Sequence, residues 1–528
     1  MKNAYKKISC LLLALTISFG VVACGGQPNR NSSGGNGGDS SSSSSRPADS
    51  SSQGGNSSVE DSSSSEEPVT PQETPYLPNG MPDYDAITGV DEFIFNSYYS
   101  PKVSRAAFQE YKDCGFNWVN LCGNTWFPST TVEDALSLAD DLGLKVLVNV
   151  SEAPTMMNQL ASTYLQYDSF QGYYFDEPFM DVHTGYNNRL GLIQLETQTR
   201  NLVASYPSVS FCVNLNPIWY TDSTYSNPTY EQYVNAMMTK INAPYQDVNS
   251  KARKWLSADD YPFWYNKSAN TKYLATDWLK GLAYLARAKS DSDMDNLVSN
   301  FFIQSMAFGT GNKSRNRPMY YKEMKMQLYT LMAFGYDSAS FFCYYTPPVV
   351  TGGEFTADQF ALIDRNNQKT QTYHDAKTLM TEVKKFQHTY MQFNDNWRGV
   401  YTVVGSGSSS RADFTDLANF DGVESLTSPI VSSSKRKRMG LTSATATRDT
   451  VIGCMEDDYG NAGFVVVNYN DTINNYSSQV DMQFDAAKFS KAWVYIDGQR
   501  SEVALSSGKL TLSLDVGEGV FVIPILNR

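Results

Sequence analysis

Histidine is almost absent from this sequence. Only His183, His374 and His388 occur among 528 residues, and they are widely spaced. Histidine is a principal ligand of catalytic zinc and the usual proton-transfer side chain near neutral pH. We therefore expect no metal ion and no cofactor, and we expect any chemistry to depend on carboxylates.

Basic charge is also scarce. The chain has 42 Lys and Arg against 55 Asp and Glu, which gives a formal net charge of −13. A protein that binds nucleic acid needs a basic face for the phosphates. This balance argues against nucleic acid as a partner.

Cysteine offers no disulfide framework. The chain has 7 cysteines, and two of them, Cys10 and Cys24, lie near the N-terminus. The others are odd in number, and the sequence has no Cys-x-x-Cys motif. We expect them to pack as small apolar side chains without a redox or metal role. They are Cys114, Cys122, Cys212, Cys343 and Cys454.

The N-terminus has the pattern of an export signal. Lys2, Lys6 and Lys7 precede an apolar run over residues 8–22, which is short for a membrane span. The run ends in Val-Val-Ala-Cys-Gly-Gly, which resembles the lipobox of bacterial lipoproteins. The resemblance implies a signal peptide over residues 1–23, a lipid such as palmitate on Cys24, and a place on the extracellular face of the cell membrane. A plain secretory signal with an incidental cysteine is the alternative.

A low-complexity segment follows this cysteine. Residues 31–70 contain 17 Ser and 6 Gly with almost no apolar side chains. Such a segment cannot bury enough surface to offset its chain entropy. We expect residues 24–75 to be a disordered tether that holds a folded head away from the membrane.

The region over residues 76–390 alternates short apolar runs with amphipathic stretches. Runs rich in β-branched or aromatic residues predict strands, and stretches with a helical period predict the helices between them. Eight such units favour an α/β fold, the (β/α)8 TIM barrel, with an open doubly wound sheet as the alternative. The expected strands are 93–98, 118–122, 145–150, 172–176, 210–214, 254–258, 301–304 and 338–344.

The pattern changes toward the C-terminus. One more helix is expected over residues 360–386. Short alternating strands then follow, separated by turn signals such as Asp497-Gly498. This pattern predicts a small antiparallel β-sandwich over residues 391–528.

Polar and aromatic side chains follow the expected barrel strands. In a (β/α)8 barrel the C-terminal ends of the strands meet on one face, where active sites lie. Together these side chains predict a cleft for a polyhydroxylated ligand, so we expect a carbohydrate substrate or ligand. The candidate substrate-binding residues are Asn96, Tyr98, Asn124, Trp126, Glu152, Asn214, Tyr261, Gln304 and Tyr344.

Two adjacent carboxylates, Asp176 and Glu177, end the fourth expected strand in the stretch Gly-Tyr-Tyr-Phe-Asp-Glu-Pro. Neighbouring strand residues face opposite sides, so we expect only one of the two to point squarely into the cleft. This stretch is similar to the fourth strand of the retaining glycoside hydrolases of clan A, which include the family 42 β-galactosidases. Residues 317–335, 341–345 and 361–367 also resemble segments of such enzymes. The resemblance implies a glycosidase with Glu177 as its general acid/base.

One position departs from that family. Clan A enzymes carry a nucleophilic Glu at the end of the seventh strand, where this sequence has Gln304. An amide cannot form a glycosyl ester, which leaves three hypotheses. Another carboxylate serves as nucleophile or base, with Asp259 or Asp260 as first candidates and Glu152 next. Alternatively, Asp176 and Glu177 act as the adjacent pair of hexosaminidases does, in which the N-acetyl group of the substrate is the nucleophile. The third hypothesis is a surface protein that binds glycan without hydrolysing it.

Overall fold

The computed structural model describes residues 75–122, 131–151, 153–182, 190–220, 228–309, 315–349, 355–408, 411–418, 420 and 439–527. From Pro75 onward these residues belong to one compact unit. The expected signal peptide, Cys24 and the tether lie outside the described residues. Within the described ranges, no helix has both the length and the apolar character to cross a membrane.

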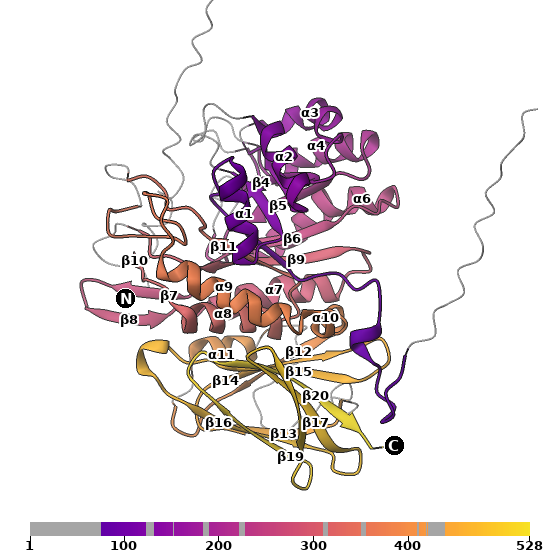
Figure 1. Cartoon of the computed structure of the whole chain (residues 1–528), viewed down its shortest axis with the longest axis vertical. Coiled ribbons are helices and arrows are strands. Elements are labelled where there is room, and N and C mark those ends of the chain that lie inside the picture. The colour runs from indigo at the N-terminus through magenta and orange to yellow at the C-terminus, as the bar shows by residue number, and fades with distance from the viewer. Residues whose placement is uncertain are drawn as a thin grey trace, which may run out of the picture. The chain divides into compact units, whose positions relative to one another are not determined.

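Eight parallel strands form the larger sheet, in the order β1-β11-β9-β6-β5-β4-β3-β2 (Figure 1). Each of the eight expected strands overlaps one of them, so these predictions are confirmed. The strands are β1 (Ile94–Ser97), β2 (Trp118–Leu121), β3 (Lys145–Asn149), β4 (Phe170–Asp176), β5 (Ser210–Leu215), β6 (Lys254–Asp259), β9 (Leu297–Gln304) and β11 (Ser338–Phe342).

Asn117 joins the two ends of this sheet. Its backbone N–H donates to the Phe95 carbonyl at 3.2 Å, and its side-chain oxygen accepts from the Phe95 N–H at 2.8 Å. The Asn117 side chain therefore supplies a hydrogen bond between β1 and β2 that a backbone carbonyl would supply in a regular pair of strands. The sheet is thus a nearly closed (β/α)8 barrel, and the open-sheet alternative is wrong.

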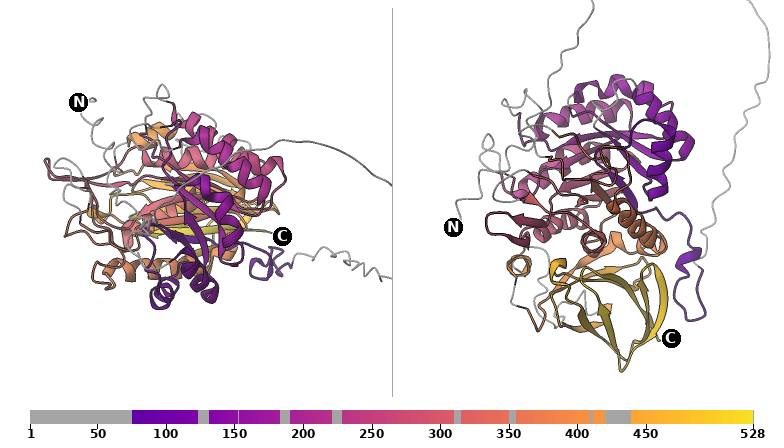
Figure 2. Two further views of the ribbon diagram at one scale, coloured as in Figure 1. Left: turned by 90° about the horizontal axis from the view of Figure 1, so that it is seen from above. Right: turned by 60° about the vertical axis from the view of Figure 1, so that its left-hand side comes forward.

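Helices lie around the outside of the barrel strands, as the right-hand view of Figure 2 shows for the indigo and magenta segments. Sequence-local signals set their limits: α2 begins with a capping box between Thr131 and Asp134 and ends at Gly143, whose φ is +65°. The helices are α1 (Arg105–Cys114), α2 (Val132–Leu142), α3 (Met157–Tyr164), α4 (Leu192–Ser205), α5 (Tyr230–Ala236), α6 (Ala243–Asp247), α7 (Trp278–Ser290), α8 (Tyr321–Ala333), α9 (Gln371–Lys384), α10 (Gln387–Tyr390) and α11 (Ala412–Ala418).

A small antiparallel sheet follows β6, and the sequence did not predict it. It pairs β7 (Phe263–Asn266) with both β8 (Thr271–Leu274) and β10 (Arg315–Asn316). This sheet lies directly after Asp259, at the C-terminal end of a barrel strand.

The C-terminal part consists of two antiparallel sheets. Rings from both sheets meet, with the centroids of Phe464 and Phe484 5.6 Å apart. The expected β-sandwich is therefore present. One sheet contains β12 (Trp397–Val403), β14 (Thr450–Glu456), β15 (Ala462–Asn468), β20 (Gly519–Leu526), β17 (Phe489–Ile496) and β18 (Gln499–Ala504), and the other contains β13 (Leu441–Ala446), β16 (Ser478–Phe484) and β19 (Lys509–Leu514).

The expected helix over residues 360–386 is wrong in its first part. The Asp364 carboxylate accepts the backbone N–H groups of Asn366 at 2.8 Å and Gln368 at 2.7 Å, and Asn367 has a φ of +62°. This turn satisfies the backbone locally and competes with a helix. Only the part from Gln371 to Lys384 forms α9.

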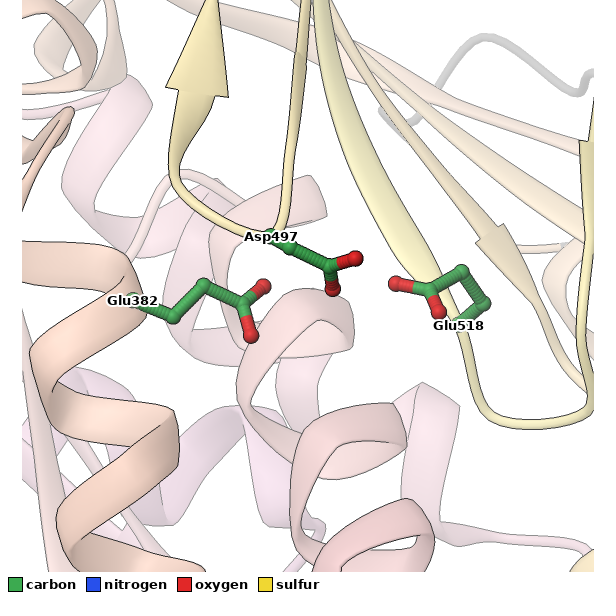
Figure 3. Close-up of side chains that lie close together, drawn as sticks. All are labelled: Glu382, Asp497 and Glu518. Carbon is green, nitrogen blue, oxygen red and sulfur yellow. The ribbon is translucent and has the colours of Figure 1, made fainter.

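A buried lysine connects the barrel helices to the sandwich. The Nζ atom of Lys325 on α8 lies 3.1 Å from Glu382 and 2.8 Å from Asp497, and it also contacts Glu518. Figure 3 shows that these three carboxylates, from α9 and two turns of the sandwich, face one another. Lys325 is only 2% exposed; burial opposes its charge, but Glu518 and Glu382 raise its pKa. Three carboxylates at this spacing could hold a metal ion, and the ammonium group of Lys325 lies among them as a cation.

Removing this lysine should destabilise the protein strongly. In Lys325→Met, Glu382 and Glu518 lose their buried counterion, so we expect the free energy of unfolding to fall by about 3–5 kcal/mol. The matched control is Lys491→Met, because Lys491 pairs with Glu502 on the surface with both side chains about half exposed. That control should change stability by about 1 kcal/mol or less. Equal losses in urea denaturation of the two variants would contradict the role of Lys325.

Candidate active site

Asp176 ends strand β4 and points into the barrel. Its carboxylate accepts hydrogen bonds from the phenol of Tyr98 at 2.9 Å, the phenol of Tyr174 at 2.7 Å and the Nδ2 atom of Asn214 at 3.3 Å. The side chain is 7% exposed. These donors lie on β4, on β5 and directly after β1, and they fix Asp176 as a hydrogen-bond acceptor.

Glu177 follows at once and is half-buried. Its φ is +39°, in the left-handed region, and its backbone N–H donates to the carbonyl of Asn214 at 2.9 Å. The strand has ended, so the strict alternation expected for Asp176 and Glu177 does not hold. The Glu177 side chain instead lies beside the carboxyl group of Asp259, close enough for its charge and hydrogen bonding to raise the pKa of Asp259.

Asp259 ends strand β6 and supplies the third carboxyl group. It is 8% exposed, and its Oδ1 atom accepts from Nδ2 of Asn214 at 3.3 Å. Burial, and then the charges of Glu177 and Asp176, raise the pKa of Asp259 well above its ordinary value. The raised pKa of Asp259 favours a proton between the carboxyl groups of Asp259 and Glu177, which we call the shared proton.

Three aromatic rings frame these carboxyl groups. The ring centroid of Phe342 lies 5.9 Å from that of Tyr98 and 5.4 Å from that of Tyr261. Burial and the nearby Asp259 raise the pKa of Tyr261 well above its ordinary value, so its phenol stays protonated. All three side chains are partly exposed. The arrangement offers apolar ring faces beside acids, which suits the C–H faces and hydroxyls of a sugar.

The other proposed nucleophile, Asp260, faces away from the pair. Its Oδ1 atom accepts the backbone N–H of Tyr261 at 2.8 Å, and burial and Asp277 raise its pKa well above the ordinary value. Asp259 and Asp260 are neighbours on an extended chain, and the register of β6 turns only Asp259 into the barrel. The structure therefore brings Glu177 together with Asp259.

Gln304 is buried, and its amide group bonds to the backbone of neighbouring segments. It is 0% exposed, its Nε2 atom donates to the carbonyl of Arg317 at 2.8 Å, and its Oε1 atom accepts the N–H of Phe263 at 3.3 Å. Its amide thus holds the β7–β8–β10 sheet against β9. The structure does not place it beside the carboxyl pair as a free ligand for sugar.

The remaining sequence candidates fall into three groups. Asn96 is buried in the barrel interior, two residues before Tyr98. Tyr344 packs outside the barrel, with its ring centroid 4.8 Å from that of Tyr111, and is not part of the carboxylate group. Asn124, Trp126 and Glu152 lie outside the described residues.

Some residues of this site were missed from the sequence. Tyr174, Ser257 and Phe342 each lie on a barrel strand and face the interior. Tyr174 and Ser257 each precede a site carboxylate by two residues, so the strand period was the signal that could have found them. Phe342 required the register of β11 against β9.

Comparisons with known proteins give similarity in three dimensions only. No protein-family model and no curated protein matches the sequence. A catalytic mutant of a GH42 β-galactosidase from G. stearothermophilus aligns at 9% identity with a TM-score of 0.46, covering 82% of this chain and 98% of that one. A β-galactosidase from Bacillus circulans sp. alkalophilus aligns at 8% with a TM-score of 0.47, covering 82% and 99%. At these values no residue role or activity is transferred to this chain.

Replacing Asp259 with Asn should stabilise the protein above pH 4. The raised pKa of Asp259 means that its carboxyl favours the folded state at low pH and loses that contribution as pH rises toward its folded pKa. Asn cannot ionise, yet its carboxamide still offers an acceptor to Asn214 and a donor to Glu177. We expect Asp259→Asn to gain on the order of 1 kcal/mol over wild type at pH 8, with the gain vanishing near pH 4.

The measurement is the free energy of unfolding as a function of pH. Asp295→Asn is the control, because Asp295 is a surface residue with 73% of its side chain exposed. Its curve should run parallel to wild type. A parallel curve for Asp259→Asn as well would contradict the shared proton.

Proposed function

We propose that this protein is a glycoside hydrolase that cleaves O-glycosidic bonds of an oligosaccharide or polysaccharide. The observation that carries the proposal is the hydrogen-bonded pair of Glu177 and Asp259 at the C-terminal ends of the barrel strands. A glycosidase needs one protonated and one ionised carboxyl group, and a pair that shares one proton supplies both. The aromatic rings of Tyr98, Tyr261 and Phe342 support a sugar as the ligand.

The two carboxyl groups take different roles. Glu177 is half-buried and Asp259 nearly fully buried, so a substrate oxygen reaches Glu177 first. We assign Glu177 as the general acid that delivers the shared proton to the leaving oxygen. Asp259 is then left ionised, and its charge stabilises the developing positive charge of the sugar. It attacks the sugar as nucleophile or activates a water molecule as base.

Substrate binding must change the contact within the pair. Carboxyl groups stand about 5–5.5 Å apart in retaining and about 6.5–9.5 Å apart in inverting glycosidases. A direct hydrogen bond is closer than either distance. The sugar ring therefore replaces this contact when it binds, and the carboxyl groups turn from each other to the substrate.

Glu177→Gln should lose nearly all turnover while it still binds sugar. General acid catalysis contributes about 10²–10⁴-fold, and Gln keeps the shape of Glu but cannot deliver the proton. The assay is a panel of aryl glycosides and polysaccharides with the full chain. The matched control is Asp260→Asn, a neighbouring buried acid that faces away from the site, and it should keep turnover.

Two outcomes would contradict this proposal. Unchanged turnover in Glu177→Gln would remove Glu177 from the chemistry. Saturable glycan binding by the wild-type protein with no released product from any substrate would identify a glycan-binding protein instead of a hydrolase.

We further propose that the protein is attached to the extracellular face of the membrane through a lipid on Cys24. The support is the lipobox-like stretch at residues 21–26 and the Ser-rich and Gly-rich segment that follows it. A catalytic head on such a tether would meet polysaccharides outside the cell. The partners of the protein are therefore a carbohydrate and the membrane.

Cys24→Ser should abolish lipid attachment. We expect wild-type protein to incorporate a labelled palmitate analogue and to sediment with membranes, and Cys24→Ser to do neither. Cys10→Ser is the control, because Cys10 lies within the apolar run, before the expected cleavage point. Labelling that persists in Cys24→Ser would contradict the anchor.

A further inference from the structure

A row of polar side chains crosses the interior of the barrel and ends at the carboxyl groups. We call it the polar series; it consists of Asn120, Asn96, Ser338, Asn300, Ser257 and Asn214, in this order. All six are buried. They come from β2, β1, β11, β9, β6 and β5, so the series passes through most of the barrel strands.

Asn214 is the end of the series that touches the site. Its Nδ2 atom lies 3.3 Å from Asp176 and 3.3 Å from Asp259, and its backbone carbonyl accepts the N–H of Glu177. Only the amino end of a carboxamide can face two carboxyl oxygens, because its oxygen would be repelled. Asn214 thus contacts all three acids and has one permitted orientation.

The other members fix this orientation from behind. The Ser257 hydroxyl donates to Oδ1 of Asn214 at 2.8 Å, so its lone pair is free to accept Nδ2 of Asn300, also at 2.8 Å. Oδ1 of Asn300 in turn accepts the hydroxyl of Ser338 at 2.7 Å. Asn96 donates to Ser338 at 3.4 Å, and Asn120 donates to Asn96 at 3.2 Å. Each hydrogen in the series therefore points toward the carboxyl groups, and aligned dipoles of this kind favour negative charge at that end.

Packing alone does not call for such a series. The interior of a (β/α)8 barrel is usually filled by bulky branched residues. Apolar side chains such as Leu147, Trp255 and Val298 fill the rest of this interior. Polar groups in the same place must each find a partner, because an unsatisfied one is costly to bury.

We propose that Ser257 and Asn300 are positioning residues that hold the Asn214 carboxamide, and through it the Asp259 carboxyl, in place against Glu177. This inference rests on the proposed hydrolase function for its effect on turnover. Its effect on the acids themselves does not depend on any substrate.

Among the residues that the structure describes, the titratable groups found to act on Asp259 are acidic or phenolic. Glu177 and Asp176 face it from β4, Asp260 adjoins it, and the phenols of Tyr230, Tyr233 and Tyr261 lie close enough to interact with its charge. The pKa values of these phenols are raised by burial, so they stay neutral. Among the described groups that act on Asp259, the Asn214 amino group is thus a principal donor to its ionised form.

The test compares Ser257→Ala with Ser97→Ala. Ser97 is a fully buried strand serine bonded to the neutral phenol of Tyr111 at 3.1 Å, away from the acids. With an aryl glycoside substrate, Ser257→Ala should lower kcat about tenfold or more and leave KM within about twofold, because only the reacting geometry is disturbed. Weaker donation from Asn214 disfavours ionised Asp259, so the acidic limb of the pH profile, which follows ionisation of Asp259, should move up by about half a pH unit or more. Ser257→Thr, which keeps the hydroxyl, should restore the profile.

A second readout needs no substrate. In Ser257→Ala the curve of unfolding free energy against pH should change shape between pH 4 and 8. In Ser97→Ala the unfolding free energy should fall by the same amount at every pH in this range. If Ser257→Ala does not fold, Asn300→Leu, which interrupts the series one step earlier and fills the volume, should show the same change. Identical curve shapes for the Ser257 and Ser97 variants would overturn the positioning role. Absence of turnover in the wild type, with the stability curves still different, would reject only the hydrolase function.

Discussion

The site depends on one constraint: three acidic side chains converge in a largely buried volume, where burial and the neighbouring acids oppose ionisation of Asp259. Asp176, Glu177 and Asp259 converge there, and burial makes full ionisation unfavourable. Asp176 is supplied with donors from Tyr98, Tyr174 and Asn214, so it takes the role of the stable acceptor. The raised pKa of Asp259 then favours a proton between Asp259 and Glu177.

The two clusters of buried acids differ in the groups that surround them. In the Lys325 cluster, an ammonium group from the same chain forms ion pairs with all three acids and links α8, α9 and the sandwich. At the barrel end, Asp259 lies among acids, phenols and one amide in the part of the chain that the structure describes. The first arrangement stabilises the fold, whereas in the second burial and the neighbouring acids oppose ionisation of Asp259. That difference is typical of a functional site.

The strands and the location of the site could be predicted from sequence because both follow local patterns. Apolar runs marked all eight barrel strands, and Asp176-Glu177 at a strand end marked the carboxylates. Local patterns could not tell whether Asp259 or Asp260 points into the barrel, since this depends on the register of β6 against β9. The role of Gln304 was not local either, because its partners Phe263 and Arg317 belong to a small sheet that the sequence did not indicate. The backbone at Glu177 has a positive φ, so the alternation of side chains along a strand does not extend to this residue. The expectation that only one of Asp176 and Glu177 points into the cleft depended on that alternation.

The most direct test of the account is the titration of the Glu177 and Asp259 carboxyl groups by carbon-13 NMR with labelled Asp and Glu. A shared proton predicts that one carboxyl of the pair is still protonated at pH 7, and that in Asp259→Asn the Glu177 carboxyl no longer shows this coupled step. If both carboxyl groups in the wild type lose their protons near their ordinary pKa values of about 4, the central claim is wrong.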